Sequence, residues 1–255
     1  FGSGTAHSEY IAAGFFPVVD GEANFDLSQI QAALVHRDDV QFNDGWHVQG
    51  LKGTGSKDIV IERAFVPEHR THKSMDGFLC DNPGNAVNDA PLYRMPFMQV
   101  FVRAVCTATL GACEGALQAF IEVAKTRQVG PNKMSNDPYA RQLAAEVRAS
   151  IEEMKLTMVR NFDAMMESCR SGEAIPVDSR VRYRYDSAVV ADRCLELSSR
   201  MLKASGSGGI RKGSELLDFH LDMLASQAHV ANNSVPFANN MGGMMFGEEN
   251  LDYAV

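Results

Sequence analysis

The pattern of apolar and polar positions changes its period near residue 90. Before that point, short stretches rich in β-branched and aromatic residues alternate with turn residues, which predicts antiparallel strands and hairpins. These stretches are residues 10–19, 32–36, 46–49 and 58–66. The clearest turn is Asn43-Asp44-Gly45, and it predicts a hairpin between residues 40–42 and 46–48.

After residue 90 the apolar period is about 3.6, which is typical of amphipathic helices. Small and apolar residues fall on one stripe from Val102 to Val123, so this helix is expected to pack closely on several sides. A second helix is predicted for 138–171, because Asp137-Pro138 offers an N-cap and an early Pro, and Gly172 a stop. A third helix is predicted for 178–204. A fourth covers about 213–232 and carries His229.

These patterns predict an α+β protein. Residues 1–90 are expected to form an antiparallel β domain, and residues 91–255 a C-terminal bundle of long helices. The boundary is placed at the loop 81–85, which has turn residues and little apolar content.

Composition and charge narrow the function. The 255 residues include 24 Lys and Arg against 32 Asp and Glu, a net charge of −8, and no basic run, which argues against nucleic-acid binding. No apolar run approaches the roughly 18 residues that span a bilayer, so no membrane partner is expected. Five Cys are too few for a disulfide scaffold, and their odd number suits a reducing cytoplasm.

Three features resemble reactive sites and have a simpler interpretation. The loop Gly53-Thr54-Gly55-Ser56-Lys57 lacks the Gly-Lys-Ser/Thr order of a Walker loop and precedes a strand, which favours a tight turn. His69 and His72 have no third ligand nearby, so no metal site is expected. Cys106 and Cys113 are expected to be buried structural thiols.

Two features in the helical part carry more weight. The segment Ser205 to Gly209 is rich in Gly, so its backbone could approach a flat or phosphorylated ligand closely; an ordinary interhelix loop is the alternative. His229 lies among small residues, where it is either a functional group or a satisfied core or interface residue. The residues alone leave these alternatives open.

The order of motifs resembles that of the acyl-CoA dehydrogenase superfamily. Residues 46–62 with Ala64-Phe65-Val66-Pro67 are similar to the end of its middle β domain, particularly in oxygenase components of two-component flavin-dependent monooxygenases. Phe1-Gly2-Ser3-Gly4 and residues 6–10 resemble the strand entry at the flavin, and residues 205–209 with 216–229 resemble the closing segment. The resemblance covers essentially the whole chain. It implies an acyl-CoA dehydrogenase-like fold, of which this chain holds the middle and C-terminal domains without the N-terminal helical domain.

The resemblance also allows a dehydrogenase to be distinguished from a monooxygenase. A dehydrogenase needs a carboxylate base over the flavin. Most relatives place it on the segment matching 227–230, and others near 98–102, and neither segment has a carboxylate here. A His at 229 is what the monooxygenases place there. Where relatives often carry Arg-Asp, this chain has Leu221-Asp222, so an ion pair of that Arg is absent or replaced.

The resemblance implies an oxygenase component that uses reduced flavin, FMN or FAD, supplied by a separate reductase. The flavin would react with dioxygen to form a C4a-hydroperoxide and hydroxylate an aromatic or polycyclic small molecule. His229 and Ser3 match the catalytic positions: the His faces the peroxide, and the Ser hydroxyl bonds the flavin N5 region. Residues implied in cofactor binding are Phe1, Ser3, Arg127, Ser205, Gly206, Gly208 and Gly209.

In this comparison Arg127 contacts flavin phosphate, often across a subunit boundary, and a guanidinium suits that role. Residues 205–209 lie against the flavin of a neighbouring subunit. A homotetramer built on a helical bundle is therefore expected. An acyl-CoA dehydrogenase with an unusual base, and a noncatalytic flavin-binding scaffold, remain the alternatives.

Overall fold

The computed structural model describes residues 2–252 and 254–255, which form two compact units. Unit 1 holds the described residues up to Val48, together with Lys52–Phe97 and Ala254. Unit 2 holds Gln49–Leu51, the described part of Met98–Tyr253, and Val255. This division falls after Phe97, and the domain limits of 1–90 and 91–255 stay a prediction.

Unit 1 is built on an antiparallel sheet with the strand order β1-β4-β7, and these strands are Tyr10–Phe15, Gln31–His36 and Thr71–Lys73. Tyr10 lies opposite His36, and Ala33 lies opposite Thr71. Ile11, Ala33, Val35 and Val40 form its small buried core. A second hairpin joins β2 (Val18–Val19) to β3 (Glu22–Ala23), and one short helix follows, α1 (Ser74–Phe78). The antiparallel β part of the predicted fold is therefore confirmed.

The predicted hairpin at Asn43-Asp44-Gly45 is wrong. Strand β5 (Gln41–Asn43) pairs with β6 (Asp58–Val60), and residues 46–49 form no strand. The segment after them is bound by unit 2: the N–H of Leu51 donates to Oδ1 of Asp222 at 2.6 Å. Gly50 lies so close to the carbonyl of Leu221 that a Cβ would stand 2.0 Å from its oxygen. This long-range docking competes with the local turn and prevails.

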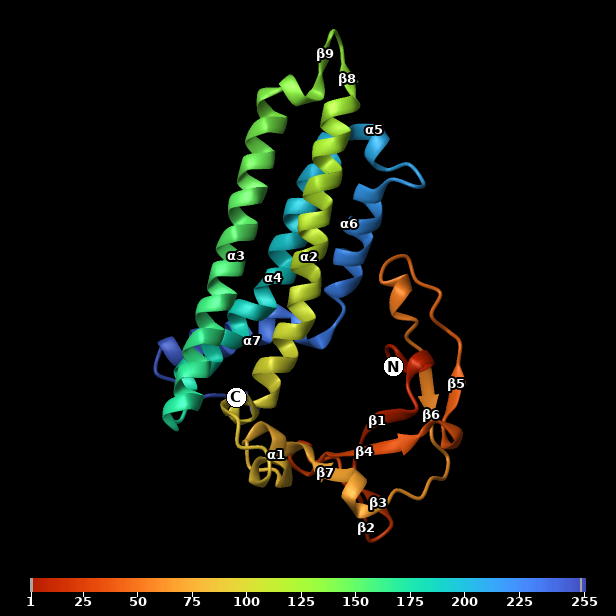
Figure 1. The fold of residues 1–255 in the computed structure, drawn as a ribbon, viewed down its shortest axis with the longest axis vertical. Helices are drawn as coiled ribbons and strands as arrows, with labels where there is room; N and C mark the ends of the chain where they lie inside the picture. The colour runs from red at the N-terminus through yellow and green to blue at the C-terminus, as the bar shows by residue number, and fades with distance from the viewer. Residues whose placement is uncertain (1, 253) are drawn as a thin grey trace. The chain divides into compact units, whose positions relative to one another are not determined.

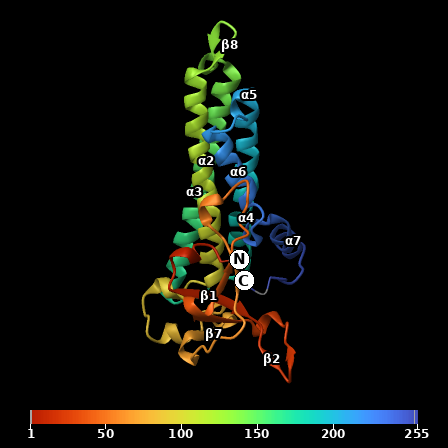
Figure 2. The ribbon, with the colours of Figure 1, turned by 90° about the vertical axis from the view of Figure 1, so that its right-hand side faces the viewer.

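Unit 2 is a bundle of long helices (Figure 1). Its helices are α2 (Phe97–Thr126, whose first residue belongs to unit 1), α3 (Pro138–Ser171), α4 (Val177–Ala204), α5 (Gly206–Gly209), α6 (Glu215–Ser226) and α7 (Ser234–Met245). Between α2 and α3 lies a small hairpin of β8 (Gln128–Val129) and β9 (Asn132–Lys133). The three long helices lie side by side in both views (Figure 2).

The predicted helix ends at α3 are confirmed by their capping groups. The Asp137 side chain accepts the N–H of Ala140 at 3.2 Å, which satisfies a free donor of the first turn. Gly172 closes the helix with a φ of 77°, a left-handed conformation that glycine adopts without strain. The ends of α3 are therefore set by local sequence.

The core of unit 2 joins α2, α3, α4 and α6. Its largest fully buried side chains include Phe120, Leu143, Ile151, Met201 and Met223. Burying each such side chain contributes about 1.5–3 kcal/mol. Small residues bring the helices together: a Cβ on Gly115 of α2 would stand 2.5 Å from the Phe219 ring of α6.

Helix α2 corrects one expectation from the sequence. By length and composition it could cross a membrane, so the view that no stretch reaches that size is wrong. The core helix of a helical bundle passes the same test, and 39% of the apolar window is buried inside this structure. The helix alone is therefore weak support for a membrane span.

The docking of Gly50 can be tested by adding one methyl group. Gly50→Ala would place a Cβ against the Leu221 carbonyl, and we expect it to lower the free energy of unfolding by about 1–3 kcal/mol. Gly53→Ala is the matched control, because a Cβ there meets nothing within 4 Å. Denaturant unfolding of the two variants measures the difference, and equal stabilities would contradict this docking.

Candidate functional site

Ser3 is held by the loop 53–57, for which the sequence predicts a tight turn. Its Oγ lies 2.7 Å from Oγ of buried Ser56, which in turn lies 2.8 Å from Oγ1 of Thr54. The N–H of Gly2 donates to the carbonyl of Lys57 at 2.8 Å. The loop thus supports the segment that carries Ser3. Phe1, the other candidate there, lies outside the described residues.

His229 does not lie on a helix, so this part of the fourth-helix prediction is wrong. Helix α6 ends at Ser226, and His229 precedes a short 3-10 helix, Val230–Asn232. The physical reason is a side chain: Nδ2 of Asn232 donates to the Ser226 carbonyl at 2.9 Å and thereby occupies an acceptor that a continuing helix would use. The chain turns instead, and His229 lies in that turn.

The imidazole of His229 is fixed in one tautomer. Its Nδ1 accepts the N–H of Ala231 at 3.1 Å, so the proton of the neutral ring lies on Nε2. The side chain is exposed, yet the atoms around it desolvate the ring and lower its pKa from the ordinary 6.5. The neutral, Nε2-protonated ring is therefore the form this turn favours, and it can donate a hydrogen bond.

Both segments that could carry a dehydrogenase base meet at this imidazole. The ring of Phe101, in the first turns of α2, lies 5.8 Å from the ring of His229, centroid to centroid. Residues 98–102 and 227–230 are thus neighbours inside unit 2, and neither contains a carboxylate. The meeting point offers an aromatic ring and an imidazole N–H.

Arg127 is packed against the Gly-rich turn between α4 and α6, a contact that the sequence did not predict. Gly206 has a φ of 55°, and a Cβ there would stand 2.7 Å from Nη2 of Arg127. Nη1 of Arg127 is buried and has no hydrogen-bond partner within the described part of the chain. The guanidinium therefore retains an unused donor beside the turn. We call Arg127 and Gly206–Gly209 the arginine cradle.

Ser205 differs from the other candidates in this turn. It is fully buried, and its hydroxyl donates to the carbonyl of Met201 at 3.0 Å. Its side chain is therefore used to end α4. Gly208 and Gly209 present backbone only, and a Cβ on Gly208 would stand 3.9 Å from Nη1 of Arg127.

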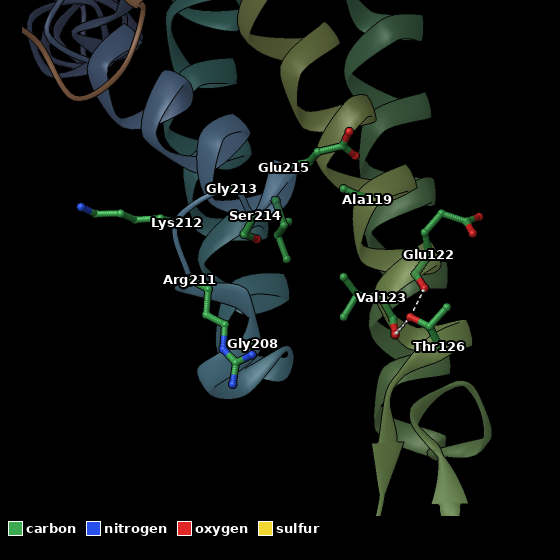
Figure 3. Close-up of a pocket in the computed structure, with 11 residues that line it drawn as sticks. Ala119, Glu122, Val123, Thr126, Gly208, Arg211, Lys212, Gly213, Ser214 and Glu215 are labelled. Atoms are coloured by element: carbon green, nitrogen blue, oxygen red, sulfur yellow. Dashed lines mark hydrogen bonds between the residues drawn. The ribbon is translucent and has the colours of Figure 1, made fainter.

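A pocket of about 400 Å³ opens beside the arginine cradle (Figure 3). One wall is α2, with Val123 and Thr126, and the other is α5 with the segment after it, which contribute Gly208, Arg211 and Ser214. The guanidinium of Arg211 lies near Gly208 in this view, whereas Lys212 points away. The lining thus combines the cation of Arg211 with two carboxylates, those of Glu122 and Glu215.

The structure brings only some of the predicted residues together. Arg127 and the Gly-rich turn form one cluster in unit 2, at the end of α6 that begins with Glu215. His229 follows the other end of the same helix. Ser3 belongs to unit 1.

Metal binding finds no support in the described ranges, 2–252 and 254–255. No group of three His, Cys, Asp or Glu side chains there could hold a metal ion. Cys106 and Cys113 are buried, as expected. Burial raises the pKa of Cys106 to about 11 and outweighs the opposing effect of nearby Arg103, so this thiol is unreactive near neutral pH.

Comparison with known proteins identifies the family. The family model for the acyl-CoA dehydrogenase C-terminal domain matches residues 104–234, just over half of the chain. The chain belongs to this family. The match runs from α2 to the start of α7 and includes Arg127, the Gly-rich turn and His229.

Among its relatives is the flavin-dependent monooxygenase, oxygenase subunit HsaA, of Rhodococcus jostii, 29% identical over 236 residues. That match covers 91% of this chain and 60% of the relative, so the chain spans well under two thirds of its length. The crystal structure of 3-HSA hydroxylase from Rhodococcus sp. RHA1 superposes with a TM-score of 0.91 at 27% identity, covering 99% of this chain and 65% of that one.

An acyl-CoA dehydrogenase from Geobacillus kaustophilus shares the fold, with a TM-score of 0.70 at 16% identity, covering 95% of this chain and 58% of that one. The predicted acyl-CoA dehydrogenase-like α+β fold is therefore confirmed.

Two histidines of unit 2, His220 and His229, predict a loss of stability in mild acid. Burial lowers the pKa of His229 and of His220, whose Nδ1 lies 2.9 Å from Oγ of Ser198, below the ordinary 6.5. Near pH 6.5 the unfolded chain therefore binds protons that the folded chain does not, and stability falls as the pH drops through this value. Melting temperatures between pH 7.5 and 5.5 should decline.

His220→Gln should make this decline shallower, and His72→Gln, at an exposed position on β7, should leave it as in the wild type. An unchanged slope in His220→Gln would show that the ring is charged without cost in the folded chain.

Proposed function

We propose that this chain carries the middle and C-terminal domains of the oxygenase component of a two-component flavin-dependent monooxygenase. Its substrate would be an aromatic or polycyclic small molecule, and a separate reductase would supply reduced FMN or FAD. The observation that carries the proposal is the contact between Phe101 and His229, where the two possible base segments meet without a carboxylate.

The hydrogen bonds around this point favour oxygenation over dehydrogenation. Removing an α-proton requires a base with a free lone pair. Within the described residues, the carboxylate that bonds to the turn is that of Asp192, and each of its oxygens accepts a hydrogen bond from a side chain there. His229 presents an N–H donor, which suits stabilising or protonating an oxygen atom.

The chain fits a flavin at its phosphate end. The missing side chain of Gly206 lets the Arg127 guanidinium lie against the turn, and its Nη1 keeps an unused donor. That donor suits a phosphate group, which guanidinium binds through charge-assisted hydrogen bonds. Arg211 adds a second cation at the adjoining pocket. When bound, reduced flavin supplies the electrons that activate dioxygen. The Ser3 hydroxyl, supported by Ser56, would hold the ring of the flavin near N5.

The positions of these groups support an assembly of several copies. The arginine cradle and His229 lie at opposite ends of α6, whose 12 residues span about 18 Å. This separation favours a site in which one copy binds the flavin phosphate and another presents His229, in keeping with the homotetramer implied by the resemblance. The cytoplasm, where the reductase would supply reduced flavin, is the proposed location.

Oxygen consumption tests the activity directly. The full-length protein, mixed with reduced flavin and a phenolic substrate, is expected to consume dioxygen and form hydroxylated product. His229→Ala should shift most of the consumed oxygen to hydrogen peroxide, a loss of about 100-fold in product rate. Reduction of bound flavin by an acyl-CoA without oxygen would instead establish a dehydrogenase, and flavin binding without turnover would establish a scaffold.

Arg127 should control affinity for the flavin. Arg127→Ala removes charged hydrogen bonds worth about 1.5–3 kcal/mol, so reduced flavin should bind roughly 10- to 150-fold more weakly. The control is Lys125→Ala, an exposed residue of the same helix end that pairs with Glu122. Anaerobic titration measures both, and equal affinities in the two variants would exclude Arg127 from the site.

A further inference from the structure

Asp192 of α4 is bonded to both ends of the turn that carries His229. At one end, Nε2 of Gln227 donates to Oδ1 of Asp192 at 2.7 Å, one residue after α6 ends. At the other, Oγ of Ser234, the first residue of α7, donates to Oδ2 at 2.5 Å. A single carboxylate therefore fixes the distance between the two ends of residues 227–234. We call this pair of bonds the Asp192 clamp.

Hydrogen bonds within residues 226–232 also fix the middle of the turn. Asn232, with 1% of its surface exposed, donates from Nδ2 to the Ser226 carbonyl at 2.9 Å. His229 is held by the N–H of Ala231, at 3.1 Å from Nδ1. The direction of the imidazole thus follows the backbone of the turn, and this backbone is set at its ends by the clamp.

The helices on either side do not depend on the clamp for their packing. Helix α6 is anchored through buried Leu216 and Met223, and α7 packs on α4 with Phe237 beneath the guanidinium of Arg184 at 4.3 Å. Loss of the Asp192 carboxylate would therefore loosen the turn and leave α6 and α7 in place.

We propose that Asp192 is a positioning residue, whose clamp aims the Nε2–H of His229 at the reacting oxygen. This inference rests on the proposed function for the importance of His229 in the reaction. Among the described residues, Asp192 is the ionisable group whose side chain is bonded to the turn, and α2 contributes the uncharged ring of Phe101. The chemistry requires a carboxylate: an amide at 192 has one acceptor oxygen and could receive only one of the two donors well.

The first measurement follows the histidine itself, in the full-length protein without flavin. Nitrogen-15 NMR of the ring reports the tautomer and the titration of His229. The wild type should show the Nε2-protonated neutral form with a pKa below 6.5. In Asp192→Asn and Asp192→Ala, the two tautomers should mix, and the titration should move toward 6.5. The matched control is Glu196→Gln, an exposed carboxylate one turn further along α4, which should behave as the wild type.

The second measurement follows turnover with reduced flavin, dioxygen and a phenolic substrate. Asp192→Asn should lower kcat about tenfold, as loss of an outer hydrogen-bond partner typically does, with KM within about twofold of the wild type. The lost turnover should appear as hydrogen peroxide. A merely structural role would lower the amount of active protein and leave the ratio of product to peroxide unchanged.

The two measurements separate the positioning role from the proposed function. An unchanged tautomer and titration of His229 in a folded Asp192→Asn protein would overturn the clamp, whatever the activity. A changed tautomer in a protein whose wild type consumes no oxygen would support the clamp and refute the monooxygenase. If Asp192→Ala fails to fold, Gln227→Ala and Ser234→Ala each remove one bond. Both should shift the tautomer partway, and no shift in either would overturn the proposal.

Discussion

The close approach of α6 to α2 is the contact on which both candidate sites of unit 2 depend. The Phe219 ring of α6 packs where Gly115 of α2 has no side chain, and a Cβ there would stand 2.5 Å from the ring. This contact, together with the packing of α6 on α4, holds α6 in its place in the bundle. Because α6 is a rigid segment with the Gly-rich turn before it and His229 after it, the position of α6 places both ends. Packing density in the core thus decides where the polar chemistry lies.

The same helix accepts a charge-assisted hydrogen bond from the loop 49–51. Asp222 has Leu221 before it where relatives often have Arg, and its carboxylate accepts the backbone N–H of Leu51. A carboxylate on α6 therefore binds a backbone donor from the loop 49–51, and Gly50 allows the loop to lie directly on the helix.

Local rules predicted the elements whose ends are determined by neighbours in sequence. The caps at Asp137 and Gly172 lie next to α3, and both ends of that helix were found from them. The failures depend on a side chain that binds the backbone, across a long separation in one case and across six residues in the other. The hydrogen bond between Leu51 and Asp222 joins residues 171 apart in the sequence, and no local sequence pattern predicts it. His229 was placed on a helix because Ala, Ser and Gln favour helix locally, whereas the Asn232 side chain turns the chain away.

The residues of the candidate site likewise divide into those that the sequence could indicate and those that only the fold reveals. The sequence could indicate Arg127, the Gly-rich turn and His229, because the resemblance assigns a role to each of these positions separately. Asp192 could not be found, because its role exists only through Gln227 and Ser234, which lie 35 and 42 residues further along the chain. On α4 it is one carboxylate among several. A residue that positions another residue has no sequence signal of its own. The role of Asp192 becomes visible only in the fold, where Gln227 and Ser234 donate to its carboxylate from either side of His229.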